Sequence, residues 1–245
     1  MMRSGNPALN RNTFSNTRTV SGDQAMTING TVNKTSLCLL LLMTSAIYTW
    51  NNLELSPTLF FSIMIGTFIL LLITLFNKKM APFTVPLYCL LEGALLGAIS
   101  AWADAIPEYS GIASEAICLT FGILAALLML YKSKMIAVTD NFRLGIFSAT
   151  FGIFIVYMLS YVLSIFEISF MGQLFGNGTI GIVFSLFVIG IAAFNLVLDF
   201  DFIEHGAEQG APKYMEWYGA FGLMITLIWL YIEILNLLMK LRSRR

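Results

Sequence analysis

Four acidic side chains lie within or beside apolar runs of membrane-spanning length in this 245-residue sequence: Glu92, Asp199, Asp201 and Glu233. A charged carboxylate at the centre of a bilayer costs about 2.5–3.5 kcal/mol. The same runs contain no Lys or Arg that would neutralise it. Such a group can stay protonated, share a proton with another acid or bind a cation. The residue types therefore predict a pH-sensitive acid cluster with an affinity for protons or cations.

Helical spacing divides the acids of the sixth run between two faces. Asn195 and Asp199 are four residues apart and share one face, so Asn195 is a supporting residue for Asp199. Asp201 points about 200° around the helix from Asp199 and shares a second face with Glu204, another supporting residue. A second interpretation stays open, in which Asp199, Asp201 and Glu92 reach water at one end of the helices and cap them.

The composition excludes a soluble globular domain. Hydrophobic residues make up 58% of the chain and charged residues 11%, against about 25% charged in ordinary soluble domains. The formal net charge of zero gives no indication of nucleic-acid binding. We expect an all-α, polytopic membrane protein with seven transmembrane helices, near residues 36–51, 58–76, 83–102, 113–131, 144–165, 180–202 and 217–238.

Basic residues indicate the orientation of these helices. We expect a polar cytoplasmic N-terminal tail over 1–35, a seven-helix domain over 36–240 and a basic C-terminal tail over 241–245. With the N-terminus in the cytoplasm, every Lys or Arg before the C-terminal end falls on the cytoplasmic side, which satisfies the positive-inside rule. Seven crossings put the basic C-terminal end outside. Either the last segment is re-entrant or a short basic tail is translocated against the charge rule. Composition alone favours six crossings with one atypical last segment.

Small residues three or four positions apart predict close helix packing. Gly93 and Gly97 form one such step, and Gly145, Ala149 and Gly152 line another helix. The chain has no HExxH zinc motif, no GxSxG motif and no Ser/His or Cys/His pairing. We therefore expect no enzyme activity, no cofactor and no resident metal beyond a transient ion at the acids.

Two short motifs resemble the Bax inhibitor/YccA-like membrane family, in a bacterial branch. Asp199 followed by Ile203 is similar to the D-x-x-x-I pattern of that family's sixth helix. The segment 230–235, Leu-Tyr-Ile-Glu-Ile-Leu, is similar to the L-Y-L-D-I-I of its last helix. The segments 3–7 and 210–218 resemble the bacterial branch in the same way, and the likeness covers about residues 36–240.

The resemblance implies a fold in which two groups of three helices surround a central last helix. It also implies a multi-pass protein of the bacterial inner membrane that acts as a pH-sensitive calcium leak, with Ca²⁺ or H⁺ as the transported ion. Its gating acids correspond here to Asp199 and Glu233. Glu92 would then lie on the ion path, and Asp201 would shape its cytoplasmic mouth.

The spacing of the two gating acids predicts different depths. If the turn lies near Gly210, Asp199 is 11 residues before it and Glu233 is 23 after it. At 1.5 Å per residue, their depths differ by about 18 Å. A direct carboxylate pair then needs an extra cytoplasmic stretch, a broken helix or a tilted last helix. Glu92 is the alternative partner for either acid.

Two other function classes remain as alternatives. The first is a non-transporting membrane regulator that modulates a membrane-bound protease or a stress response through helix–helix contacts at Gly93 and Gly97. The second is a proton-coupled solute carrier, for which the sequence shows no internal repeat. Neutral substitutions of the acids distinguish the regulator from an ion-conducting protein, because a regulator that acts by helix contacts keeps its function without the charges.

Overall fold

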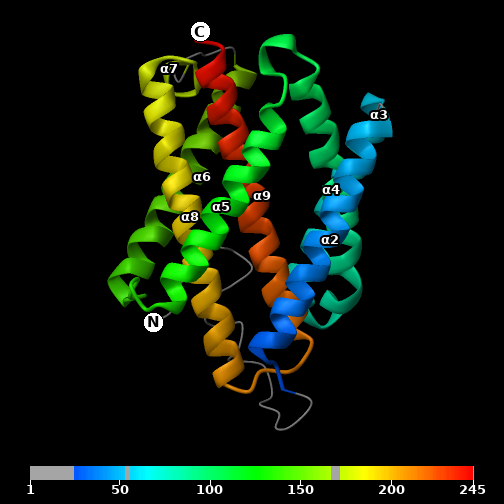
Figure 1. Cartoon of the computed structure of the whole chain (residues 1–245), viewed down its shortest axis with the longest axis vertical. Coiled ribbons are helices and arrows are strands. Elements are labelled where there is room, and N and C mark those ends of the chain that lie inside the picture. The colour runs from blue at the N-terminus through cyan, green and yellow to red at the C-terminus, as the bar shows by residue number, and fades with distance from the viewer. Residues whose placement is uncertain (1–24, 53–55, 167–171, 245) are drawn as a thin grey trace. The chain divides into compact units, whose positions relative to one another are not determined.

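The computed structural model describes residues 25–52, 56–166 and 172–244. This part of the chain is helical and contains no β-strand apart from one isolated bridge, between Ala25 and Pro212. Seven helices are long and apolar enough to cross a membrane, which confirms the all-α prediction. They are α2 (Ile28–Asn52), α3 (Pro57–Phe76), α4 (Ala81–Asp104), α5 (Ile112–Lys132), α6 (Asp140–Ile165), α8 (Thr179–Glu208) and α9 (Met215–Arg242), and the short α7 (Gly172–Phe175) precedes α8 (Figure 1).

Helix α2 begins at Ile28, eight residues before the predicted start near 36. The backbone N–H of Gly30 donates to the Thr27 hydroxyl at 2.9 Å, so Thr27 caps the helix. Residues 28–35 of the predicted polar tail are therefore helical, and residues 1–24 of it lie outside the described residues. The sequence has a polar first turn here, and the apolar run alone could not reveal that the helix extends through it.

The chain forms two compact units. The described part of the first unit consists of residues 107–166, 172–200 and 226–244, which include α5, α6 and α7. The described part of the second consists of residues 25–52, 56–106 and 201–225, which include α2, α3 and α4. Helices α8 and α9 are divided between the units, so that one end of each helix belongs to the first unit and the other end to the second.

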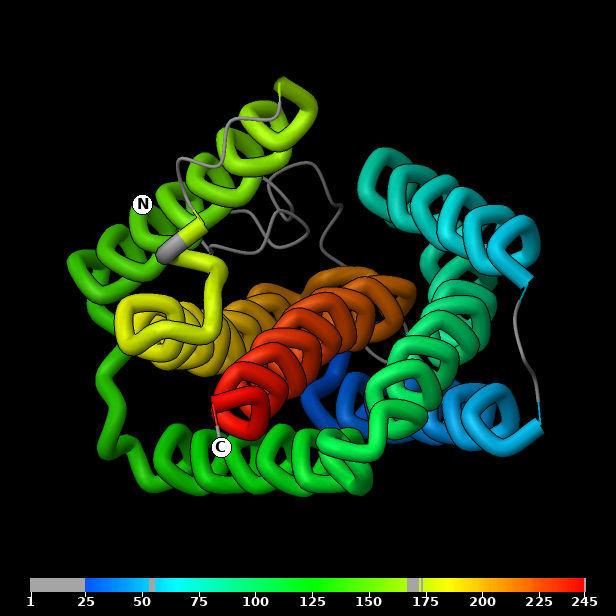
Figure 2. Tube along the Cα trace, turned by 90° about the horizontal axis from the view of Figure 1, so that it is seen from above, coloured from blue at the N-terminus to red at the C-terminus, as the bar shows by residue number. Residues whose placement is uncertain are grey.

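In the second unit α4 packs against both α2 and α3 (Figure 2). The contact with α2 is a backbone contact. A Cβ added to Gly93 would lie 2.3 Å from the carbonyl oxygen of Leu42, and one added to Gly97 would lie 2.3 Å from that of Ala46. The two contacts are four residues apart on both helices, so α2 and α4 run parallel. The predicted packing role of these two glycines holds, and their partner is a helix of the same chain.

The other small-residue stripe behaves differently. A Cβ added to Gly145 or Gly152 on α6 would meet no atom within 4 Å. No close helix contact is therefore made at these two glycines, whereas Ala149 of the same stripe packs against the apolar core of the first unit.

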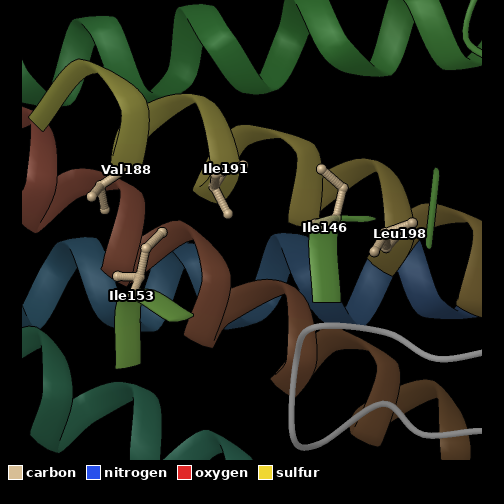
Figure 3. Packing of buried hydrophobic residues seen from close by; sticks show 5 residues of the cluster. All are labelled: Ile146, Ile153, Val188, Ile191 and Leu198. Atoms are coloured by element: carbon tan, nitrogen blue, oxygen red, sulfur yellow. The ribbon is translucent and has the colours of Figure 1, made fainter. Parts of the chain in front are cut away.

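Helices α6 and α8 form the apolar core of the first unit. Ile146 and Ile153 of α6 pack with Val188, Ile191 and Leu198 of α8 (Figure 3). The spacings of seven and three residues place each set on one helix face. This packing fixes the side of α8 that carries Asn195 and Asp199.

Helix α9 is the most buried of the seven. Its most apolar window is 72% buried, against 11% for α3 and for α6, as expected for a central last helix. Its 28 residues are unbroken and span about 42 Å, enough to cross a hydrocarbon core of about 30 Å. The last helix is therefore a seventh candidate span, in agreement with the seven predicted transmembrane helices.

The basic residues at the end of α9 bind oxygen atoms of the first unit. Lys240 Nζ donates to Ser185 Oγ at 3.0 Å, and Arg242 pairs with Glu115 at 2.5 Å. Arg244 donates to the side chain of the first residue of α8 at 3.2 Å. The charges that argued against a seventh crossing are thus bound by oxygens of the chain itself.

Candidate ion-path site

Asp199 is fully buried in the first unit. Its Oδ2 accepts a hydrogen bond from the Thr226 hydroxyl of α9 at 2.6 Å. One turn earlier on α8, the Asn195 side-chain amide donates to the Thr150 hydroxyl of α6 at 2.8 Å. Helices α6, α8 and α9 therefore meet around one group of polar side chains. We call these four residues the Asp199 layer.

Glu233 forms a second polar group in the same unit. It is 5% exposed, and its Oε1 accepts hydrogen bonds from the Tyr157 hydroxyl of α6 at 2.8 Å and from Trp229 Nε1 at 3.2 Å. Both donors are neutral, so they stabilise the carboxylate without cancelling its charge. These three residues form the Glu233 layer.

Two contacts fix the register of α8 against α9. Asp199 lies opposite Thr226, and Ser185 lies opposite Lys240. The residue numbers of both pairs have the same sum, as expected for antiparallel helices. By the same rule, Glu233 lies level with Ala192, midway between the two contacts.

The two gating acids predicted from sequence thus lie at different levels of one helix pair. Thr226 marks the level of Asp199, and Glu233 follows it by seven residues on the same face of α9. The corresponding rise is about 10 Å, not the predicted 18 Å. The predicted difference was too large because the turn between the helices covers residues 209–214, so its centre lies after Gly210. The difference in depth therefore indicates two separate carboxylates, one after the other along the helix pair, rather than one carboxylate pair.

The other predicted site residues lie in the second unit. Asp201 is 8% exposed, and its Oδ1 lies 3.6 Å from Nδ1 of His205. Glu204 is half-buried on the next turn of α8. Glu92 is half-buried on α4, beside the glycines that contact α2. The structure thus brings Asn195 and Asp199 together and places Glu233 in the same unit, whereas these three acids belong to the other one.

Sequence reasoning missed the neutral residues that hold the acids. Thr150 and Tyr157 are seven residues apart on α6, and Thr226 and Glu233 are seven apart on α9. This matching interval was the available signal. Polar residues that recur every seven positions on two apolar helices lie on one face of each. Hydroxyl side chains are common in membrane helices, so the interval alone does not identify their partners.

These features define an all-helical, polytopic membrane protein with buried carboxylates in its core. The chain matches the family model described as Bax inhibitor 1 like over residues 6–243. It therefore belongs to the Bax inhibitor 1 like family, and the resemblance noted in its sequence is confirmed. No curated protein matches the chain.

Proposed function

We propose that this protein is a pH-sensitive leak path for Ca²⁺ across the bacterial inner membrane. Asp199 and Glu233 are its ion-binding acids. The observation that carries the proposal is their placement, because both carboxylates are buried at successive levels of a membrane-spanning helix pair. Thr226, Tyr157 and Trp229 hold them through neutral donors, and Lys240 interacts electrostatically with Glu233. A proton or a cation can supply the balancing charge at Asp199.

The separation of the two acids supports conduction in steps. Binding positions in an ion path must attract the ion and still release it, and several weak positions in series achieve this. Two acids about 10 Å apart along α9 suit such a series better than a single tight site. In this proposal the N-terminus is cytoplasmic, and Glu92 and Asp201 of the second unit keep the roles that the family resemblance implies for them.

Neutral substitution of both acids tests the function. We expect Asp199→Asn with Glu233→Gln to lower Ca²⁺ flux into proteoliposomes by about tenfold or more, because the substitutions remove both charges that attract the cation. Flux through the wild type should differ between about pH 6 and about pH 8, because protonation removes the same charges. The double variant should lose that difference.

The matched control is Glu208→Gln, at the exposed end of α8. It removes one carboxylate charge without touching either polar layer, and we expect wild-type flux. Equal flux in the wild type and the double variant at both pH values contradicts the proposal. The alternative of a non-transporting regulator gains no support from Gly93 and Gly97, because α2 of the same chain covers both glycines.

A further inference from the structure

Asn195 is held in one orientation by its own hydrogen bonds. Its Nδ2 donates to Thr150 Oγ1 at 2.8 Å and to the backbone oxygen of Ile191 at 2.9 Å, which uses both amide protons. Exchanging the amide nitrogen and oxygen would place two oxygens against each other at Ile191. The hydrogen-bond network therefore assigns the amide orientation.

This orientation leaves the Asn195 Oδ1 without a hydrogen-bond partner among the described residues. The side chain is 1% exposed, and an unsatisfied buried acceptor costs about 1–3 kcal/mol. Asp199 follows four residues later on the same helix face, which places the two Cβ atoms about 6 Å apart. The Asn195 and Asp199 side chains thus share one face of α8 and are both buried.

The chemistry of this layer fits a hard cation. Its oxygens come from an amide, a carboxylate and two hydroxyl groups, which are ligands for Ca²⁺ and similar ions rather than for zinc or copper. The described residues contain no group of three His, Cys, Asp or Glu that could hold a metal ion. One carboxylate with neutral oxygens gives weak, reversible binding, because affinity rises with the number of charged ligands.

We propose that Asn195 Oδ1 and the Asp199 carboxylate, with the Thr226 and Thr150 hydroxyl oxygens, form a partly dehydrated binding position for Ca²⁺. Calcium–oxygen bonds of about 2.3–2.6 Å allow one ion to bridge Asn195 and Asp199 across a helical turn. Asn195 acts as a neutral ligand that keeps the position weak enough for release. This inference rests on the proposed function, in which Asp199 lies on the calcium path.

Terbium binding to the purified full-length protein tests the position. Tb³⁺ replaces Ca²⁺ at oxygen sites, and Trp229, one turn from Thr226 on α9, can sensitise its luminescence. All measurements use the Glu233→Gln background, which removes the other buried acid of the first unit. The part of the Ca²⁺ competition that Asp199→Asn removes from this background then reports the affinity of the Asp199 layer.

Two opposite substitutions at Asn195 give the expected pattern. Asn195→Asp adds a second carboxylate and should tighten Ca²⁺ competition by about tenfold or more, whereas Asn195→Leu removes the amide oxygen and should weaken it by a similar factor. Asn236→Leu, at a half-buried position of α9, is the matched control and should bind as the background does. Should the leucine variant fail to fold, the aspartate variant carries the test.

The outcomes separate this inference from the proposed function. Absence of Tb³⁺ binding in the background, or Ca²⁺ competition that neither Asn195 variant changes, overturns the cation position while the flux result for Asp199 and Glu233 stands. If the Asn195 variants change the Ca²⁺ competition but the double variant of Asp199 and Glu233 leaves the Ca²⁺ flux unchanged, the cation position is supported and the proposed calcium leak is refuted.

Discussion

Replacing Glu216 with alanine is expected to lower the free energy of unfolding by about 3–5 kcal/mol, the range for removing one partner of a buried ion pair. Glu216 is fully buried in the first turn of α9. Its Oε2 pairs with Lys34 Nζ at 2.5 Å, and its Oε1 accepts from the backbone N–H and the hydroxyl of Thr27 at 3.1 and 3.0 Å. One carboxylate therefore joins the start of α9 to the start of α2 within the second unit.

The large effect has two physical sources. Without Glu216, the ammonium of Lys34 loses its carboxylate partner and retains the contact with the Trp217 ring, whose centre is 5.8 Å away. The Lys34 side chain is only 22% exposed, so water replaces the lost partner incompletely. The start of α2 also loses a negative charge near its positive dipole end. The carboxylate fits closely against Gly30, where an added Cβ would lie 2.0 Å from Oε1, so position 30 has no room for a side chain while Glu216 keeps its place. Unfolding in mixed micelles titrated with sodium dodecyl sulfate, followed by helical circular dichroism, measures the change.

Glu115→Ala is the control for this prediction. Glu115 pairs with Arg242 at the same 2.5 Å, but its side chain is 52% exposed. Water screens an exposed pair, so we expect a loss of no more than about 1 kcal/mol. Equal losses for the two alanine variants would show that burial does not determine the strength of these pairs.

The same contact shows what the sequence could not reveal about the fold. Seven apolar runs predicted seven helices, because any run of about 20 apolar residues must satisfy its backbone within the membrane. The start of α2 depends instead on Thr27 and on Glu216, which lies 189 residues away. Composition carries no information on such a pair. Opposite charges at Lys34 and Glu216, near the ends of two segments, were the only signal.

The candidate site was predictable to a similar degree. Asn195 and Asp199 could be grouped from their spacing on one helix. Their partners Thr150 and Thr226 could not, since a hydroxyl in an apolar helix has a local alternative. Thr120, for example, donates back to the carbonyl of the residue four positions earlier at 2.7 Å. Only the packing of α6, α8 and α9 decides which hydroxyl groups turn toward an acid.

Glycine spacing gives the clearest case in which similar patterns have different meanings. Gly93 with Gly97, and Gly145 with Gly152, are both small-residue stripes in sequence. In the first, an added Cβ would meet a backbone oxygen, and in the second it would meet nothing within 4 Å. Small residues permit a close approach between helices, but the rest of the fold determines whether another helix packs against them.

Alanine at Gly93 or Gly97 is therefore expected to destabilise the protein by about 1–3 kcal/mol or more at each position, the range for overpacking. The atoms that would be struck are the backbone of Leu42 and Ala46, so no side chain can rotate away. Helix α2 must move from α4 as a whole. The hydrogen bond from Ser45 Oγ to the Leu90 carbonyl, 2.7 Å long, should break with this movement. Unfolding in mixed micelles measures the loss at each position.

Alanine at Gly122 or Gly152 provides the matched control with the opposite sign. Both glycines lie inside helices, and an added Cβ would meet no atom within 4 Å. Alanine favours a helix over glycine by about 0.8–1.0 kcal/mol, so these variants should be unchanged or more stable. The sign of the change thus reports whether a glycine is needed for close approach. Losses of similar size at all four positions would contradict the α2–α4 backbone contact, because glycine would then act through the helix itself.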